Sequence, residues 1–588
     1  MAIKDKDKFL SLARERFSTL QSAEYHNREA SLEDLKFTYN IEDGQWPQEI
    51  RDERVADGRP CLTSNKLRKF VSQVANMERD QRLAGKVRPV DSKADVITAG
   101  VIEGLIRQIE YASDAETVYC ETGEKAIAGG FGYWRLITEE KDDCFDQEVF
   151  IRRIKNQFSV SIDPDRKYAF IREGITNKEF EARYPDIDRS SFDSSSIGEE
   201  WALWYEKDKT FIAEYFYMEP YDKTIAQCKV LETGQVLIIE LTDEITPELL
   251  IQEGIRILRQ KTSKAEKVKW SKITGSDILE EGDWVGKEIP IIEVEGDSFN
   301  IAGKDYKRSL IRDAKDPQRG YNFWKTHMAE TVALAPKAPY IVTPQQIKGF
   351  ESAWNSANKK NLPYLLYNAQ GQLIPKRELP PQVPTGAAQM LQIEAGDIQD
   401  TIGKYEASFG ERSNERTGVA IKQRANRSDF ATYHFPDNFR RAIIKTIRQL
   451  VDVVPKIYDT ERAERIIGED GKDEIVTINQ TVFDDKTGKT KIINDLSYGK
   501  YDAVADVRMW STRRQEEVEN LTAFAQGAPN IAPLLLPMIA ENSDWPGAQE
   551  LKKLVDKYLP ALMGIEQPAE AGQTTNSPES IPGVTGGA

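Results

Sequence analysis

Few side chains in this sequence have the types and spacing that catalysis or metal binding requires. The chain has three histidines, His26, His327 and His434, and none belongs to a recognisable catalytic motif. Its four cysteines form no Cys-x-x-Cys pair, which disfavours a zinc site and a disulfide framework. The acidic run Asp142 to Asp146 offers hard oxygen ligands, but without EF-hand spacing a surface turn is the simpler interpretation. We therefore expect no catalytic residue, no cofactor and no metal site.

Phosphate-binding loops are missing as well. None of the Gly-Lys pairs, such as Gly85-Lys86 and Gly403-Lys404, stands in a GxxxxGK[ST] pattern, and no GxGxxG follows a predicted strand. The glycines Gly129, Gly130 and Gly132 are expected to end a helix and begin a strand, because no helix follows them to bind a phosphate. If the protein takes part in ATP-driven work, another protein supplies the ATPase.

The charge of the chain limits its possible partners. A net charge of −16 argues against tight wrapping of nucleic acid, which needs a basic surface, but it is compatible with a conduit that DNA slides past. One segment is basic although the chain as a whole is acidic. Its cations are Arg256, Arg259, Lys261, Lys264, Lys267 and Lys269. We interpret it as a contact for an acidic partner or for DNA phosphates, and the alternative is a solvated hairpin. Lys376 and Arg377, in a proline-rich loop, are candidates for contact with passing DNA.

The elements that would position these residues are of mixed type. At 588 residues the chain is long enough for about three or four domain-sized units. It has no apolar run of 18 residues and no signal-peptide pattern, so we expect a protein made in the cytosol without a membrane span. Helical periodicity predicts helices near 5–36, 67–82, 95–112, 318–335, 387–401, 438–454 and 513–562. Short strands are expected over 150–240, 225–306 and 464–507, which makes the fold class α+β.

The stretch from Asp313 to Pro344 is the most informative part of the sequence. It predicts a long helix that ends at paired prolines and leads into a β-run. We expect Phe323, Trp324 and Met328 on this helix to pack against protein, including neighbouring subunits.

Four collinear blocks carry a resemblance to a known family. They are Gly58 to Asp91, Ala126 to Asp165, Asp313 to Asn368 with its `NKKNLPYLLYN` end, and Ser413 to Val507, which contains `SNERTGVAIKQRANRSDF` and `DLSYGKYDAVADV`. Together they cover most of residues 50–510. In them the chain resembles the portal, or head-to-tail connector, proteins of short-tailed double-stranded DNA phages.

The resemblance implies a ring-forming virion protein, made in the host cytoplasm, through which the genome is packaged and ejected. It implies a dodecamer whose partners are the large terminase, tail adaptors, coat and scaffolding proteins, and double-stranded DNA. By chain order it implies that residues 1–215 form the wing, that residues 216–308 form the stem entry and clip, and that residues 309–335 form the stem helix. Residues 336–385 would form wing strands and the tunnel loop, and residues 386–510 would form the tunnel helix, the crown and β-hairpins. Residues 511–564 would form C-terminal helices with at most a short barrel, and residues 565–588 a disordered tail.

Two other interpretations stay open from the residues alone. A phage-encoded metal-dependent nucleic-acid-processing enzyme would need a converging Asp/Glu/His cluster, and no motif supplies one. A tail adaptor would also act as a connector, although adaptors are generally much smaller than this chain.

Overall fold

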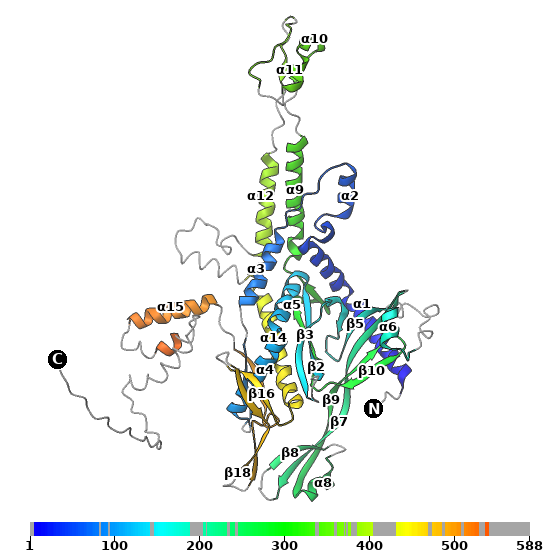
Figure 1. The fold of residues 1–588 in the computed structure, drawn as a ribbon, viewed down its shortest axis with the longest axis vertical. Coiled ribbons are helices and arrows are strands. Elements are labelled where there is room, and N and C mark those ends of the chain that lie inside the picture. The colour runs from blue at the N-terminus through cyan, green and yellow to red at the C-terminus, as the bar shows by residue number, and fades with distance from the viewer. Residues whose placement is uncertain are drawn as a thin grey trace, which may run out of the picture. The chain divides into compact units, whose positions relative to one another are not determined.

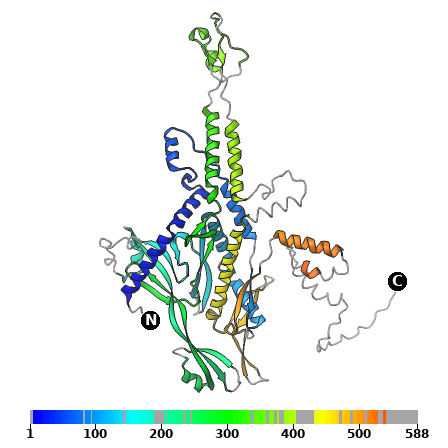
Figure 2. The same ribbon diagram turned by 180° about the vertical axis from the view of Figure 1, so that it is seen from behind.

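The structure is a computed structural model, and Figures 1 and 2 show its ribbon from opposite sides. It describes residues 5–80, 84–91, 94–140, 146–187, 204–206, 208–231, 236–241, 245–334, 340–357, 362–369, 371, 374–377, 385–403, 431–468, 473–484, 489–506, 511–527 and 535–539. The chain divides into two units, residues 1–506 and 507–588. The mixture of helices and antiparallel sheets in the first unit agrees with the predicted α+β class.

Helix α1, Lys6–Tyr39, begins where the Asp5 side chain accepts the backbone N–H of Lys8, and it ends at Asn40 in the left-handed conformation. Its buried residues recur every three or four positions and pack on aromatic residues of the largest sheet. These residues are Leu10, Ala13, Phe17 and Leu20 on the helix, and Phe170, Trp204 and Tyr215 on the sheet side. The sequence-predicted helix over 5–36 is confirmed.

The largest sheet has seven antiparallel strands in the order β10-β9-β7-β5-β4, and β6 and β8 also pair with β7. Their bounds are β4 Val160–Ile162, β5 Tyr168–Thr176, β6 Tyr205–Glu206, β7 Lys209–Val230, β8 Val236–Leu241, β9 Ile255–Ile273 and β10 Ile278–Asp283. The prediction of short strands in this region was wrong for β7 and β9, which have 22 and 19 residues and pair from Ala213 and Ile273 to Val230 and Ile255. No glycine or proline interrupts β9, so nothing in its sequence breaks the ladder.

A three-stranded sheet, in the order β11-β2-β3, lies against a group of helices. The bounds are β2 Phe131–Glu140, β3 Gln147–Arg153, β11 Ile291–Glu295, α3 Leu67–Asp80, α4 Val96–Ala112, α5 Ala115–Gly129 and α14 His434–Ile457. Helix α5 ends at Gly130, whose φ of +94° suits glycine, and β2 begins one residue later. The predicted helix-to-strand turn at these glycines is therefore confirmed. Trp134 of β2 donates its indole N–H to Thr446 of α14 at 2.9 Å, inside the core.

Helices α9, Lys315–Leu334, and α12, Thr385–Ile402, run side by side in both views. Both helices were predicted from periodicity, and both are confirmed. Gly320 of α9 faces Glu394 of α12, and Ile398 and Ile402 of α12 share a core with residues just before α9, so the two helices are antiparallel. The last residue of α9 and the first residue of α12 therefore lie at the same end of this pair. The described residues between the two helices hold β14 Tyr340–Ile341, α10 Pro344–Ile347, α11 Glu351–Ser356 and β15 Lys376–Arg377.

The remaining elements are short. In the first unit the short helices are η1 Ile41–Asp43, α2 Gln48–Ala56, η2 Gln157–Ser159, α6 Asn177–Arg183, α8 Pro247–Gln252 and η5 Arg312–Ala314. Four further two-stranded sheets lie in its described residues: β1 Ala84–Pro89 with β20 Tyr501–Asp506; β12 Asp297–Ile301 with β13 Lys304–Arg308; β16 Arg462–Ile467 with β17 Asp473–Ile478; and β18 Gln480–Asp484 with β19 Lys489–Ile493. The second unit contains α15, Ser511–Gly527. The expected tail over 565–588 lies outside the described residues. Within the described residues no helix has the length and apolarity that crossing a bilayer requires.

Candidate functional site

One face of α9 is polar and fully buried. Gln318, Asn322 and Thr326 are at most 1% exposed and recur at intervals of four residues. Their oxygens accept backbone N–H groups from the segment 62–66, Lys66 to Gln318 at 3.1 Å, Ser64 to Asn322 at 2.9 Å and Leu62 to Thr326 at 3.1 Å. The spacing fits an extended segment, because four helical residues rise about 6 Å and two extended residues rise about 6.6 Å. The helix therefore binds residues 62–66 much as a neighbouring strand would.

The same side chains return hydrogen bonds to that segment. The Gln318 amide donates to the Ser64 carbonyl at 2.9 Å, and the Thr326 hydroxyl donates to the Leu62 carbonyl at 3.3 Å. The Asn322 amide donates to Gln45 at 2.9 Å. Sequence reasoning missed this face, although polar residues at 318, 322 and 326 were a visible signal for it.

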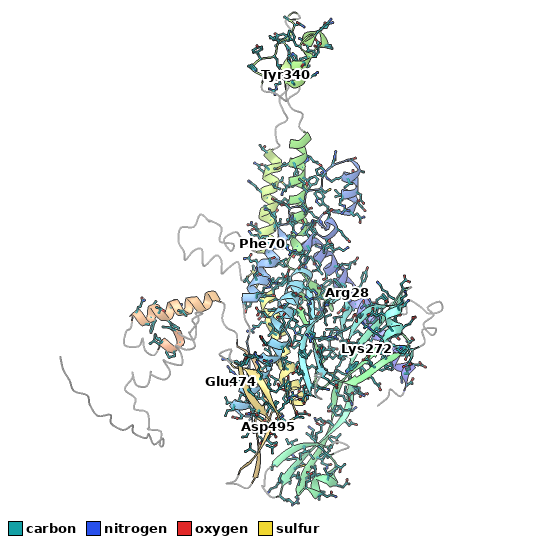
Figure 3. All side chains as sticks on the ribbon, in the orientation of Figure 1. Arg28, Phe70, Lys272, Tyr340, Glu474 and Asp495 are labelled. Atoms are coloured by element: carbon teal, nitrogen blue, oxygen red, sulfur yellow. The ribbon has the colours of Figure 1, made fainter. Side chains whose placement is uncertain are left out.

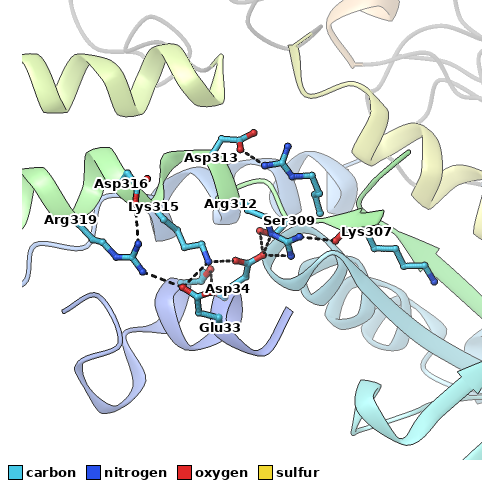
Figure 4. A network of polar contacts seen from close by, with 11 residues as sticks. Glu33, Asp34, Lys307, Ser309, Arg312, Asp313, Lys315, Asp316 and Arg319 are labelled. Atoms are coloured by element: carbon cyan, nitrogen blue, oxygen red, sulfur yellow. Dashed lines mark hydrogen bonds and ion pairs between the residues drawn. The ribbon is translucent and has the colours of Figure 1, made fainter. Parts of the chain in front are cut away.

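The first turn of α9 is held to α1 by a network of charges around Asp34, which Figure 4 shows at close range. The Asp34 side chain is 0% exposed. It accepts hydrogen bonds from Ser309 at 2.7 Å and from the Arg312 guanidinium at 2.9 and 2.7 Å, and Lys315 lies 2.7 Å away as an ion pair. Two cations and a hydroxyl thus compensate a buried carboxylate, as burial of such a charge requires.

Glu33 extends this network toward the solvent. Its carboxylate lies 3.0 Å from Lys315 and 3.2 Å from Arg319. Burial by itself would raise the pKa of Glu33, but the hydrogen bonds and charges of Lys315 and Arg319 outweigh it and lower that pKa. Asp316, which is 89% exposed, also contacts Arg319 at 3.0 Å. The base of α9 is therefore anchored to α1 by charges as well as by the apolar core that Phe37 shares with Ile311 and Ala314.

The predicted packing residues lie on other faces of α9. Phe323 is 45% exposed within the chain, and Trp324 and Met328 are half-buried. One side of the helix carries Gly320, Trp324 and Met328, which are spaced four residues apart. This side faces α12, because Gly320 lies against Glu394. Phe323 stacks on His327 with ring centroids 6.4 Å apart. The most buried face of this helix is the polar one, and packing of Phe323, Trp324 and Met328 against neighbouring subunits stays a prediction.

Lys376 and Arg377 do not lie in an irregular loop. They form β15, which pairs with β14 at Tyr340 and Ile341, and Arg377 places its guanidinium 5.1 Å from the centroid of the Tyr340 ring. Tyr340 marks this part of the chain in Figure 3. Both basic residues are exposed.

We call residues 340–377 the inserted module. Trp354 contacts the edge of the Tyr340 ring at a centroid distance of 5.2 Å, and its indole N–H donates to the Leu366 carbonyl at 2.8 Å. Around this small centre many apolar side chains stay exposed, namely Ile341 at 58%, Tyr364 at 72%, Leu366 at 55%, Tyr367 at 39% and Ile374 at 74%. So much apolar exposure on a short segment is typical of a surface that another protein covers.

The basic segment lies on β9, and internal ion pairs neutralise part of it. Lys269 lies 2.8 Å from Glu219, whose hydrogen bond raises the pKa of that lysine, and Lys267 lies 3.8 Å from Glu219 and 3.6 Å from Asp283. Lys269 belongs to the part of β9 that pairs with β10, where Figure 3 labels Lys272, and Lys267 lies two residues before it. Contact of these two cations with a partner stays a prediction.

The other end of β9 carries cations on one face. Ala226 and Cys228 of β7 pack against α8, so Gln227 and Lys229 point to the opposite face of the sheet. Arg259 and Arg256 are their direct cross-strand partners and share that face. Lys261, two residues beyond Arg259, lies on it as well, whereas Lys264 pairs with Asp222 on the α8 side.

We call the group Lys229, Arg256, Arg259 and Lys261 the basic face. Within the described part of the chain, none of its members forms an ion pair. Lys229 and Arg256 are both exposed and stand directly opposite each other, an arrangement of like charges that disfavours the sheet. Cations held together at a cost to the fold suggest an external anionic ligand.

Two of the histidines lie beside aromatic rings or in buried surroundings, and only Asp146 of the acidic run is described. His26 contacts the edge of the Tyr306 ring, and burial lowers the pKa of His434. Asp146 forms an ion pair with Arg462 at 3.3 Å, and residues 142–145 lie outside the described residues. Among the residues that the structure describes, no three His, Cys, Asp or Glu side chains are grouped as a metal ion would require.

Two comparisons extend over nearly the whole chain. A family model described as "Phage P22-like portal protein" matches residues 14–580. A curated protein named "Portal protein", from Acyrthosiphon pisum secondary endosymbiont phage 1, is 26% identical over 596 residues, which cover 94% of this chain and 81% of that protein. The family match spans α9, the inserted module and the basic face.

Proposed function

The chain belongs to the phage P22-like portal protein family, and on that premise we propose that copies of it close into a ring, a dodecamer, at one vertex of a phage capsid. The match of the family model over residues 14–580 is the observation that carries this proposal. The resemblance drawn from four blocks of sequence is confirmed by it. A portal protein is a structural part of the virion, and the function proposed for this chain is accordingly not enzymatic.

In the proposed ring, double-stranded DNA passes through the axial hole, inward during packaging and outward during ejection. A closed ring uses a heterologous contact, in which one face of each subunit packs on a different face of the next. We propose that a large terminase drives packaging, that tail adaptors replace it when the head is full, and that coat and scaffolding proteins hold the ring during assembly in the host cytoplasm. The net charge of −16 suits a channel that must not bind its polyanion tightly.

The contact between neighbouring copies would use the aromatic side of α9. Its polar face is already occupied by residues 62–66, and its first turn is anchored to α1. Phe323 remains 45% exposed, and aromatic side chains are enriched in the buried centres of interfaces. Phe323 would thus pack between subunits, whereas Trp324 and Met328 would pack on the side of the helix that faces α12.

We propose that docking of the terminase and adaptors falls to the inserted module rather than to residues 216–308. Its exposed apolar side chains need a partner, and the antiparallel pair α9 and α12 brings the chain into it and out of it at one end. Lys376 and Arg377 stay candidates for contact with DNA phosphates, since both are exposed on this module. Residues 216–308 would contribute a second contact through the basic face.

The size of the purified full-length protein tests the proposal. Native mass spectrometry should find a closed assembly of identical subunits, and negative-stain microscopy should show an axial channel. A protein that remains a monomer at high concentration and cleaves DNA would overturn it and favour the alternative of a metal-dependent nucleic-acid-processing enzyme. That alternative gains no support from the described residues, which lack a grouped set of metal ligands.

A further inference from the structure

A pocket of about 430 Å³ lies where four helices of the first unit meet. The last turns of α3 and α4 contribute Glu78 and Glu110, and the first turns of α5 contribute Glu116 and Cys120. Phe439 of α14 forms part of the wall. The volume falls in the range of small-molecule sites, which is about 300–1,000 Å³. No function proposed above uses this pocket.

Glu78 is the feature of the pocket that lacks an explanation. It is 3% exposed, and its Oε2 atom has no hydrogen-bond partner among the described residues. A Cβ added to Gly123 would meet that oxygen at 2.3 Å, so the carboxyl lies flat against α5 at a place where only glycine fits. A buried carboxyl oxygen without a partner is costly unless something occupies the space beside it.

Burial shifts the protonation of both deep carboxyls. It raises the pKa of Glu78 to about 8, which the nearby charge of Arg79 opposes. It raises the pKa of Glu110 to about 7, against the hydrogen bond that Glu110 accepts from the Tyr119 hydroxyl at 3.2 Å and against the charge of Arg107. A positive group in the pocket would therefore find two carboxyls ready to release protons and become its counter-charges.

The charge balance of the lining favours a cation. Carboxyls outnumber cations four to one, with Glu78, Glu110, Asp114 and Glu116 against Arg79. The Arg79 guanidinium lies 3.3 Å from Glu124, outside the lining, and also contacts Cys120, which is part of the lining.

The lining also favours an organic cation over a metal ion. Aromatic rings of Tyr111, Tyr119 and Phe439 border the pocket, and the Tyr111 ring already has the Arg465 guanidinium 5.7 Å from its centroid, as cations are attracted to aromatic rings. The carboxyls are too dispersed for a metal ion, since the described residues include no group of three metal-ligating side chains.

We propose that this pocket binds an organic cation, an alkylammonium or guanidinium group, whose charge is held by Glu78 and Glu110. The cation can come from a free amine or from a lysine or arginine side chain of a second copy, and the latter source rests on the proposed ring. The binding step is a proton exchange, in which the cation enters and the proton of Glu78 leaves to solvent. No covalent bond changes.

Calorimetry with the full-length protein and 1,4-diaminobutane tests the free-amine source. At pH 7 the diamine should bind with release of about one proton, because Glu78 changes from largely protonated to ionised, and the release is measured from the dependence of heat on buffer. Glu78→Gln should abolish binding, while it keeps the shape of the protonated carboxyl and so the fold. Glu29→Gln, an exposed change on α1, is the matched control and should bind as the original does.

Cys120 reports occupancy of the same pocket. Its alkylation rate, followed by peptide mapping at pH 8.5, should fall about tenfold at a diamine concentration ten times Kd, since only the unoccupied fraction reacts. If a second copy supplies the cation instead, assembly of the ring should protect Cys120 and added diamine should protect no further. Protection by neither diamine nor assembly, or diamine binding that survives Glu78→Gln combined with Glu110→Gln, would overturn the proposal. None of these outcomes depends on whether the channel passes DNA.

Discussion

The Asp34 carboxylate of α1 accepts two hydrogen bonds from the Arg312 guanidinium, at 2.9 and 2.7 Å, in a place where the Asp34 side chain has no exposed surface. The two residues are 278 positions apart in the chain. This pair, with Lys315, connects the first helix to the helix that we propose packs between subunits. It makes the orientation of α9 depend on charge pairing at its base.

Asp34→Ala should destabilise the first unit by about 3–5 kcal/mol, because it leaves Arg312 buried without its counter-charge and Lys315 with Glu33 alone. Urea unfolding of the full-length protein, followed by tryptophan fluorescence, measures the loss. Asp316→Ala removes a carboxylate that is 89% exposed and should change stability by less than about 1 kcal/mol. Equal losses from the two variants would contradict the role given to Asp34.

Asn322→Leu should destabilise the protein by about 1–3 kcal/mol, because the Ser64 N–H and the Gln45 carbonyl oxygen lose their buried partner. Hydrogen exchange should accelerate at Leu62, Ser64 and Lys66 in particular. His327→Asn, an exposed change on the same helix, should leave that exchange as it is. Unchanged exchange in Asn322→Leu would show that the helix does not hold this segment.

Phe323→Ser should weaken assembly while leaving the stability of the single chain nearly as it was, since the ring is 45% exposed there. Native mass spectrometry over a concentration series should show the subunit-to-ring transition moving to higher concentration. Val55→Ser, at an exposed apolar residue of α2, is the control and should assemble normally. A ring that forms equally well with Phe323→Ser would remove this face of α9 from the proposed interface.

Stability should fall as pH rises from about 4.5 to about 8. Glu78 has a pKa of about 8 in the folded protein against 4.5 for a free side chain, so the folded state binds more protons in this window and loses that advantage as pH rises. Glu110, whose folded pKa is about 7, acts in the same direction. Unfolding free energies at pH 5, 6, 7 and 8 should decline less steeply in Glu78→Gln than in the unsubstituted protein. The same slope in both would contradict the burial of this carboxyl.

Arg256→Glu should stabilise the sheet by about 0.2–1 kcal/mol, because it replaces the repulsion of Lys229 by attraction across the strands. The same change should lower DNA packaging in a reconstituted reaction, since it removes charge from the basic face. Lys304→Glu, in the exposed turn of the β12–β13 hairpin, should have no effect on packaging. Full packaging by Arg256→Glu would leave the basic face without a function.

The sequence by itself determined the local elements and the family. The four-residue spacing along α14, the helix over 5–36 and the turn at Gly130 depend on neighbours within a few positions, so periodicity and glycine content predicted them. The collinear blocks indicated a portal protein before any contact was known.

Only the tertiary structure decided which faces and charges are free. The buried side of α9 is polar because residues 62–66, more than 250 positions earlier, offer it backbone N–H groups. Lys269 is neutralised by Glu219, which reaches it through the pairing of β7 with β9. Glu78 lacks a partner because α5 and α14 close over it. Each outcome depends on contacts distant in sequence, which composition and periodicity do not encode.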